Sequence, residues 1–343
     1  MVRWLILVVA AGQCGCGSLV TKAMVYAPNA GQTISPELTP LWLVRAGGAD
    51  RELRVAVGPP EAVLRVWIIE PRLPVSVRRA RQNNGLSMGG GTLSPPPGER
   101  EGGEKPKGTL LVMHGYHGSI AWVKRTGRVF AESGYRVVLI DQRGHGRSSG
   151  DYLTYGVVES RDASRVLDAL EREGLVEGPV GVWGVSMGAA TAILMAAGDE
   201  RVKAVVAAAP YTSMREVAPG VVGLLLPPYA LVVGDETIRR YVDAAGAMAG
   251  FDPEEADVLA AIKKVKVPTL ILHGDADWVV PDSHGRRLHE ANPVQTRLVS
   301  LPWVGHLRAH YSGAMRRESV RWFDEKLGQN HEGHKGHEGH EGE

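Results

Sequence analysis

Ser186 lies between two glycines in the segment Gly184-Val185-Ser186-Met187-Gly188. A serine hydroxyl becomes a nucleophile when a histidine accepts its proton and a carboxylate orients that histidine. The apolar strand expected over 180–183 precedes the segment, and a helix rich in small residues is expected to begin at Met187. Glycines on both sides allow the tight strand-to-helix turn that holds a serine hydroxyl out at the carboxyl end of a sheet. The segment therefore predicts Ser186 as a nucleophile.

Two aspartates are candidates for the orienting carboxylate. Asp275 and Asp277 follow the apolar stretch 270–274, which is expected to be a strand. Side chains just beyond the carboxyl end of a parallel strand face the sheet edge where ligands bind, and Ser186 is expected at that edge. One aspartate can instead cap the turn that follows the strand. The spacing to Val280-Pro281 favours Asp277, and Asp275 remains the alternative.

His306 is the candidate proton acceptor, because it lies just beyond the strand expected over 296–301. Ser186, Asp277 and His306 then follow the chain order of nucleophile, acid and histidine. Three other histidines fall within expected helical stretches, where an ordinary surface histidine is the alternative interpretation: His284, His289 and His310.

Two backbone N–H groups are candidate donors to an oxyanion. One belongs to Met187, which follows the nucleophile, and the other to Tyr116 in the glycine-containing loop 114–119. Because both donors are backbone groups, replacing the Tyr116 side chain need not abolish activity. His114 and His117 are expected to shape this loop rather than to react.

The order of apolar and polar segments predicts an α/β fold. After Gly108, continuous apolar strands alternate with helices, which indicates a mostly parallel sheet covered on both faces. The segment 211–264 interrupts the alternation with helix-compatible sequence and is expected to be a cap over the site. The segment 71–108 is rich in Pro, Gly and Arg and is expected to be a flexible insertion. Three short antiparallel strands are expected before it, at 41–45, 53–57 and 63–70.

With these motifs in place, the sequence resembles the α/β-hydrolase superfamily, in particular its serine aminopeptidase-like or lysophospholipase-like branch. The resemblance covers about residues 53–327 and rests on ordered motifs at 114–115, 141–148, 184–188, 274–281 and 305–306. It implies an α/β-hydrolase fold with a helical cap, and hydrolysis of an ester, thioester or amide through an acyl group on Ser186. In such families the segment 141–148 is a structural loop. The alternatives are an acyltransferase, a peptidase and a non-catalytic binding protein.

Composition and charge limit the classes of partner. With 44% hydrophobic residues the chain can bury a large core, and a net charge of +1 gives no indication of a nucleic-acid partner. Cys14 and Cys16 are the only cysteines, so no disulfide framework or cysteine-ligated metal is expected beyond residue 16. We expect a small-molecule acyl substrate and neither a cofactor nor a metal in the active site.

The two ends of the chain carry their own signals. Residues 1–20 combine Arg3, an apolar run and small residues, which predicts an export leader, and Cys16 or Cys14 could carry a lipid anchor. Export implies a periplasmic or membrane-anchored protein, whereas a cytoplasmic location follows if this segment is not a leader. The hydrolase domain is expected over 21–327. Residues 328–343 repeat His, Glu and Gly, which predicts a disordered tail with at most weak metal binding.

Overall fold

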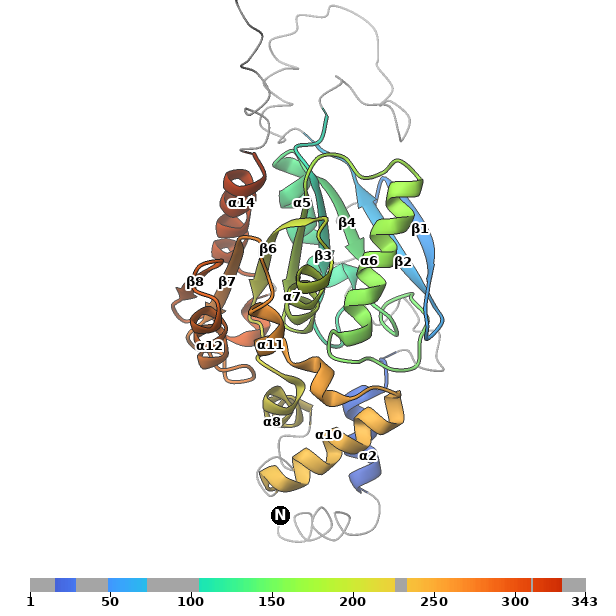
Figure 1. Ribbon diagram of the computed structural model, residues 1–343, viewed down its shortest axis with the longest axis vertical. Helices are drawn as coiled ribbons and strands as arrows, with labels where there is room; N and C mark the ends of the chain where they lie inside the picture. The colour runs from blue at the N-terminus through green and yellow to red at the C-terminus, as the bar shows by residue number, and fades with distance from the viewer. Residues whose placement is uncertain (1–15, 29–48, 73–104, 226–232, 310, 329–343) are drawn as a thin grey trace, which may run out of the picture.

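The protein is described here from a computed structural model, which places residues 16–28, 49–72, 105–225, 233–309 and 311–328. An eight-stranded sheet forms its centre, in the order β1-β2-β4-β3-β5-β6-β7-β8 (Figure 1). The first pairings, β1 with β2 and β2 with β4, are antiparallel, and all later neighbours are parallel. The mostly parallel sheet predicted from the sequence is therefore confirmed. The strands are β1 (Arg51–Val57), β2 (Ala62–Ile69), β3 (Thr109–Met113), β4 (Arg136–Ile140), β5 (Val180–Val185), β6 (Val202–Ala208), β7 (Thr269–Gly274) and β8 (Thr296–Leu301).

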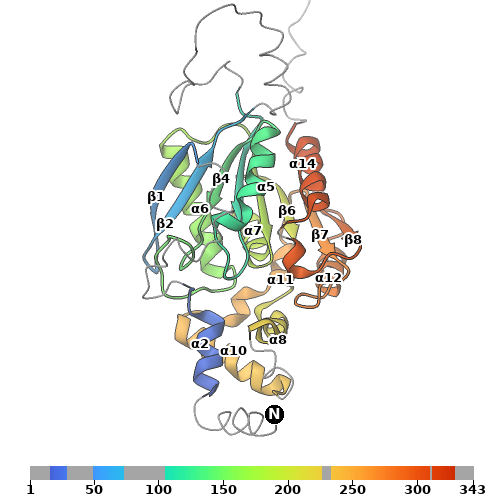
Figure 2. The ribbon, with the colours of Figure 1, turned by 180° about the vertical axis from the view of Figure 1, so that it is seen from behind.

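Helices cover both faces of the sheet because both faces are apolar. Side chains alternate between faces along a strand, so Leu111 and Met113 join one buried cluster while Leu110 and Val112 join another. The first cluster packs under α6 (Val157–Arg172), α7 (Met187–Gly198) and α12 (Ser283–Ala291). The second packs under α5 (Ile120–Glu132) and α14 (Gly313–Gly328), which lie nearer the viewer in Figure 2.

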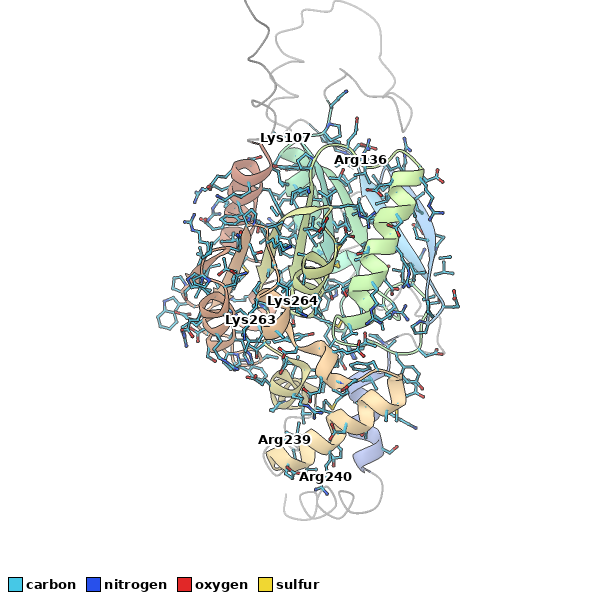
Figure 3. All side chains as sticks on the ribbon, in the orientation of Figure 1. Lys107, Arg136, Arg239, Arg240, Lys263 and Lys264 are labelled. Carbon is cyan, nitrogen blue, oxygen red and sulfur yellow. The ribbon has the colours of Figure 1, made fainter. Side chains whose placement is uncertain are left out.

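The segment predicted as a cap forms several helices. Beyond one end of the sheet, α8 (Met214–Leu225) and α10 (Asp235–Ala249) pack together (Figure 1). The short helices η2 (Pro253–Ala256) and α11 (Val258–Ile262) lead back to the sheet, where α11 packs against α7. Figure 3 shows Arg239 and Arg240 on α10 at this end, whereas Lys107 and Arg136 lie at the opposite end of the sheet.

An N-terminal helix, α2 (Cys16–Val25), lies at the same end of the molecule as the cap helices (Figure 1). Val20 and Met24, four residues apart on one helix face, are buried in the same cluster as α6 and α7. The helix packs against α8 and α10, and the backbone N–H of Ala27 donates to Asp151 O at 2.9 Å. The helix that contains residues 16–20 thus packs on the cap helices, and the domain boundary at residue 21 stays a prediction. Removal of a leader before Cys16 stays a prediction, which the mass of the mature protein tests.

Several predicted segments lie outside the described residues: the strand 41–45, most of the insertion 71–108, His310 and the histidine-rich tail. Within the described ranges, no helix has the length and apolar character needed to cross a membrane. The same ranges contain no group of three or more His, Cys, Asp or Glu side chains placed to hold a metal ion.

Candidate active site

Ser186 occupies a strained turn between β5 and α7. Its backbone has φ 54° and ψ −117°, a region that side-chain-bearing residues rarely adopt. The turn requires glycine on both sides, because a Cβ on Gly184 would lie 2.0 Å from Gly188 O. A Cβ on Gly188 would in turn lie 2.5 Å from Met113 O. The predicted glycine requirement therefore has a direct steric cause.

Replacing Gly184 by Ala is expected to lower the free energy of unfolding by about 3 kcal/mol or more, since the new methyl group overlaps backbone atoms that cannot move without shifting Ser186. Gly198→Ala is the matched control, because the last residue of α7 has no atom within 4 Å of an added Cβ. Urea unfolding of both variants measures the difference. Equal stability of the two variants would contradict the steric account.

The structure brings Ser186, His306 and Asp277 together from three separate strand ends. Ser186 Oγ lies 3.0 Å from His306 Nε2, and His306 Nδ1 lies 2.7 Å from Asp277 Oδ2. A carboxylate only accepts hydrogen bonds, so the histidine proton lies on Nδ1 and leaves Nε2 free to accept the serine proton. All three residues are nearly buried, at 7%, 7% and 6% exposed. The structure thus joins the three residues in one chain of hydrogen bonds, and their catalytic roles stay a prediction.

Asp277 is held by its own loop as well as by the histidine. Its Oδ1 accepts from the backbone N–H groups of Val279 and Val280 at 3.1 and 2.8 Å. His273, at the end of β7, donates from Nε2 to Val280 O at 2.8 Å. Burial lowers the pKa of His273, so the ring stays neutral, although it lies 3.9 Å from the Asp277 carboxylate. His273 therefore fixes the loop that carries the acid.

No motif in the sequence indicated a role for His273. The signal in the sequence is a polar ring at the end of an otherwise apolar strand, where burial without a hydrogen bond costs free energy. Here the Nδ1 atom is buried and has no hydrogen-bond partner among the described residues. A Cβ on Gly285 would lie 2.7 Å from this Nδ1 atom, so the backbone of α12 packs directly against the His273 ring.

Asp275, the alternative acid, serves a different turn. Its Oδ1 accepts a hydrogen bond from the backbone N–H of Trp303 at 2.6 Å. Asp275 is exposed, and no hydrogen bond joins it to His306 in the described part of the chain. The structure thus separates the turn-capping aspartate from the aspartate that contacts the histidine, as the spacing to Val280-Pro281 favoured.

The loop after β3 presents the backbone of Tyr116. Gly115 O accepts two hydrogen bonds, from His114 Nδ1 at 2.8 Å and from the Gly118 N–H at 3.0 Å. In a trans peptide the N–H points away from the C=O, so the pinned Gly115 carbonyl turns the Tyr116 N–H to the opposite side. His114 Nε2 also accepts from the Gln142 N–H at 3.1 Å. The predicted shaping role of His114 agrees with these contacts.

The other predicted donor, the Met187 N–H, belongs to the first residue of α7. The first N–H groups of a helix have no partner within the helix, and the helix dipole is positive there. Both predicted donors thus belong to residues beside Ser186 in one pocket, which Tyr116, Ser186 and Met187 line together.

A mostly apolar cavity of about 120 Å³ opens beside Ser186 and His306. One wall is α8, whose backbone lies so close to the acid loop that a Cβ on Gly220 would be 2.0 Å from Val279 O. The aromatic wall consists of Tyr116, Tyr155, Tyr211 and Trp122. The aliphatic lining consists of Val217, Val221, Leu224, Leu225, Val279, Val280 and Leu307.

Two further histidines, His284 and His289, have structural partners. His284 is buried, and not at the surface as the alternative interpretation had it, because its Nδ1 bonds to the Thr212 hydroxyl at 2.7 Å. His289 Nδ1 bonds to the Thr296 hydroxyl at 2.8 Å. Within the segment 141–148, Arg143 pairs with buried Asp162 at 2.7 Å, as a structural loop requires.

Comparisons with known proteins agree with this architecture. A family model described as serine aminopeptidase S33 matches residues 104–249. Two structures of comparable fold are the esterase Pf2001 of Pyrococcus furiosus and Est1E of Butyrivibrio proteoclasticus. The first has a TM-score of 0.58 at 18% identity and covers 89% of this chain and 98% of its own. The second has a TM-score of 0.54 at 16% identity, and the match covers 81% of this chain and 99% of Est1E.

Curated relatives are similar over a shorter stretch. The chain is 27% identical over 187 residues to the uncharacterized protein YqkD of Bacillus subtilis, which covers 53% of this chain and 59% of that protein. It is 29% identical over 197 residues to the lysophosphatidylserine lipase ABHD12 of Macaca fascicularis. This match covers 52% of this chain and 44% of the lipase. The chain is a member of the α/β-hydrolase superfamily.

For this α/β-hydrolase, the comparisons support a hydrolase of the serine-hydrolase type. The chain spans about half the length of the curated relatives it matches. The matched family segment contains Ser186, but Asp277 and His306 lie beyond residue 249. The assignment of those two residues therefore rests on the geometry of the site.

Proposed function

We propose that this α/β-hydrolase is a serine esterase that cleaves carboxylic esters with an apolar acyl group. The observation that carries the proposal is the hydrogen-bond chain from Asp277 through His306 to Ser186, which ends beside an apolar cavity. The names of two similar proteins, the esterase Pf2001 and the lysophosphatidylserine lipase ABHD12, agree with it.

In the first half of the reaction, Ser186 Oγ attacks the ester carbonyl carbon while its proton passes to His306 Nε2. Negative charge develops on the carbonyl oxygen, toward which the N–H groups of Met187 and Tyr116 are directed. Asp277 stabilises the imidazolium that forms. Collapse of the tetrahedral intermediate breaks the bond to the alcohol oxygen, which takes the proton from His306 and leaves an acyl group on Ser186.

In the second half, a water molecule repeats the same steps. His306 Nε2 accepts a proton from the water, whose oxygen attacks the acyl carbon. The second tetrahedral intermediate then expels Ser186 Oγ, which regains its proton from His306, and the carboxylic acid leaves. No cofactor enters this sequence, because proton transfer and charge stabilisation come from the chain itself.

The cavity favours an apolar acyl chain over a polar or charged one. Each of its three tyrosines directs its hydroxyl to a backbone carbonyl, so mainly ring carbons face the cavity. A polar substituent in such a cavity would lose its water partners without gaining new ones. A panel of p-nitrophenyl esters of increasing chain length, with aminoacyl amides beside it, tests this proposal. Hydrolysis of the amides alone would overturn the ester assignment.

The substitution Val221→Phe is expected to shorten the preferred acyl chain. Val221 lines the cavity from α8, so a larger ring fills space that a long acyl chain needs. We expect the ratio of kcat/KM for octanoate to that for acetate to fall by about tenfold or more, because one methylene in an apolar pocket changes binding by roughly 1–3 kcal/mol. The neighbouring Val222 is buried but does not line the cavity, so Val222→Phe is the matched control. Equal ratios in both variants would show that α8 does not bound the acyl site.

A further inference from the structure

The last turn of α2 is hydrogen-bonded to the wall of the acyl cavity. The Tyr116 hydroxyl donates to Ala23 O, and the Tyr155 hydroxyl donates to Met24 O at 3.0 Å. Both tyrosines line the cavity, and their rings stack with centroids 6.1 Å apart. Carbonyls in the last turn of a helix have no partner within the helix, so they are free to accept these hydroxyls. An N-terminal helix thus reaches the site across more than 90 residues of sequence.

Tyr116 is held at both its backbone and its side chain. Its backbone follows the pinned carbonyl of Gly115, and its side chain ends on α2. The next residue, His117, has φ 54°, a conformation that costs free energy unless its surroundings hold it. The contact between the Tyr116 hydroxyl and α2 therefore fixes the loop 114–119 at a second point, in addition to the hydrogen bonds of the Gly115 carbonyl.

Tyr155 connects α2 to a third tyrosine of the cavity wall. Its backbone carbonyl accepts the Tyr211 hydroxyl at 2.9 Å, so Tyr211 is connected to α2 through Tyr155, whereas Tyr116 bonds α2 separately at Ala23. Tyr155 and Tyr211 are almost completely buried, and each has its hydroxyl satisfied by a backbone carbonyl. The position of α2 thus sets the position of the aromatic side of the cavity.

We infer that α2 is a positioning element of the active site, which fixes the Tyr116 N–H against the oxyanion and Tyr155 against the acyl chain. The inference rests on the proposed esterase function. It gives a role in the folded protein to a helix that begins within the expected leader 1–20, and to the Tyr116 side chain, whose replacement was expected not to abolish activity. Ala23 and Met24 act here through backbone carbonyls, so a sequence motif does not reveal them.

The first test removes the two hydroxyls one at a time. Tyr116→Phe is expected to lower kcat by about tenfold with little change in KM, because a small displacement of a catalytic group is costly. Tyr155→Phe is expected to change the dependence of kcat/KM on acyl chain length. The matched control is Tyr135→Phe, since this buried tyrosine bonds Asp324 at 3.0 Å near Lys107 and Arg136, at the end of the sheet opposite the cap (Figure 3).

Rates are expressed per active site, which is titrated with a fluorophosphonate. A purely structural role would reduce the number of titrated sites and leave the rate per site unchanged, and this outcome overturns the inference. Equal rates in Tyr116→Phe, Tyr155→Phe and Tyr135→Phe overturn it as well. Absence of titration and of hydrolysis in the wild-type chain is a different result, since it refutes the proposed function itself.

The second test displaces the helix as a whole. Met24 lies in the last turn of α2 and is 1% exposed. Met24→Glu places a carboxylate in the apolar cluster, and this is expected to detach the helix. Lys22 lies exposed on the same helix, and Lys22→Glu is the control with the same new side chain. We expect Met24→Glu to lose at least about tenfold in rate per titrated site and Lys22→Glu to retain the wild-type rate. Wild-type rates in a folded Met24→Glu variant would overturn the inference.

Discussion

Replacing Ser186 by Ala is expected to lower ester hydrolysis by about 10⁶-fold, the size of the loss found when the nucleophile of a serine–histidine–aspartate site is removed. The same variant is expected to lose all labelling by a fluorophosphonate. The effect is this large because His306 Nε2 then has no hydroxyl to deprotonate and no acyl-enzyme forms. The fold is expected to persist, since Ala and Ser face the same backbone strain at φ 54°.

Ser160→Ala is the matched control for this prediction. Ser160 is 8% exposed, close to the 7% of Ser186, but its hydroxyl donates only to Val157 O within α6. Labelling and kcat/KM, measured beside thermal unfolding, separate loss of chemistry from loss of structure. A folded Ser186→Ala protein that still labels and hydrolyses esters would refute the proposed nucleophile.

Replacing Asp277 by Asn is expected to lower kcat by about 10⁴-fold, the effect of the same change in a well-studied serine protease. The reason lies in the loop contacts. Because the N–H groups of Val279 and Val280 both donate to one oxygen of Asp277, an asparagine keeps its carbonyl oxygen there. Its amide nitrogen then faces His306 Nδ1 and donates to it. The histidine proton moves to Nε2, where it prevents proton transfer from Ser186.

Asp275→Asn provides the control two residues away. Its Oδ1 accepts the Trp303 N–H, which an asparagine oxygen also accepts, so kcat is expected to stay within about threefold of wild type, as for a substitution away from the reacting groups. Steady-state kinetics of both variants on one ester decide between the two acids. A larger loss for Asp275→Asn would assign the orienting role to Asp275.

The order of elements along the chain was predictable because local pattern determines it. Continuous apolar runs of strand length predicted β5, β7 and β8 within a few residues, and their alternation with helices predicted the mostly parallel sheet. The glycines beside Ser186 were informative for the same reason, since a tight turn restricts the residue types next to it. The strand pair β1 and β2 also lay where alternating residues predicted it.

Contacts between distant segments were not predictable in this way. The role of His273 depends on Val280 O, which the loop folds back to place beside the ring. The N-terminal segment has the composition of a leader, yet α2 packs on α8 and α10 because helix residues four apart bury one face there. Composition does not show what that face will contact.

The sequence by itself determined the candidate catalytic residues, with two alternatives for the acid, their order along the chain, and the sheet end at which they meet. Residue type and local spacing decide these features, since parallel strands bring successive loops to one edge. Only the tertiary structure decided which aspartate contacts His306, and that carbonyls of Ala23 and Met24 receive the tyrosines of the cavity. A backbone carbonyl is the same chemical group in every residue, so its partner follows from the packing of the chain and not from residue type.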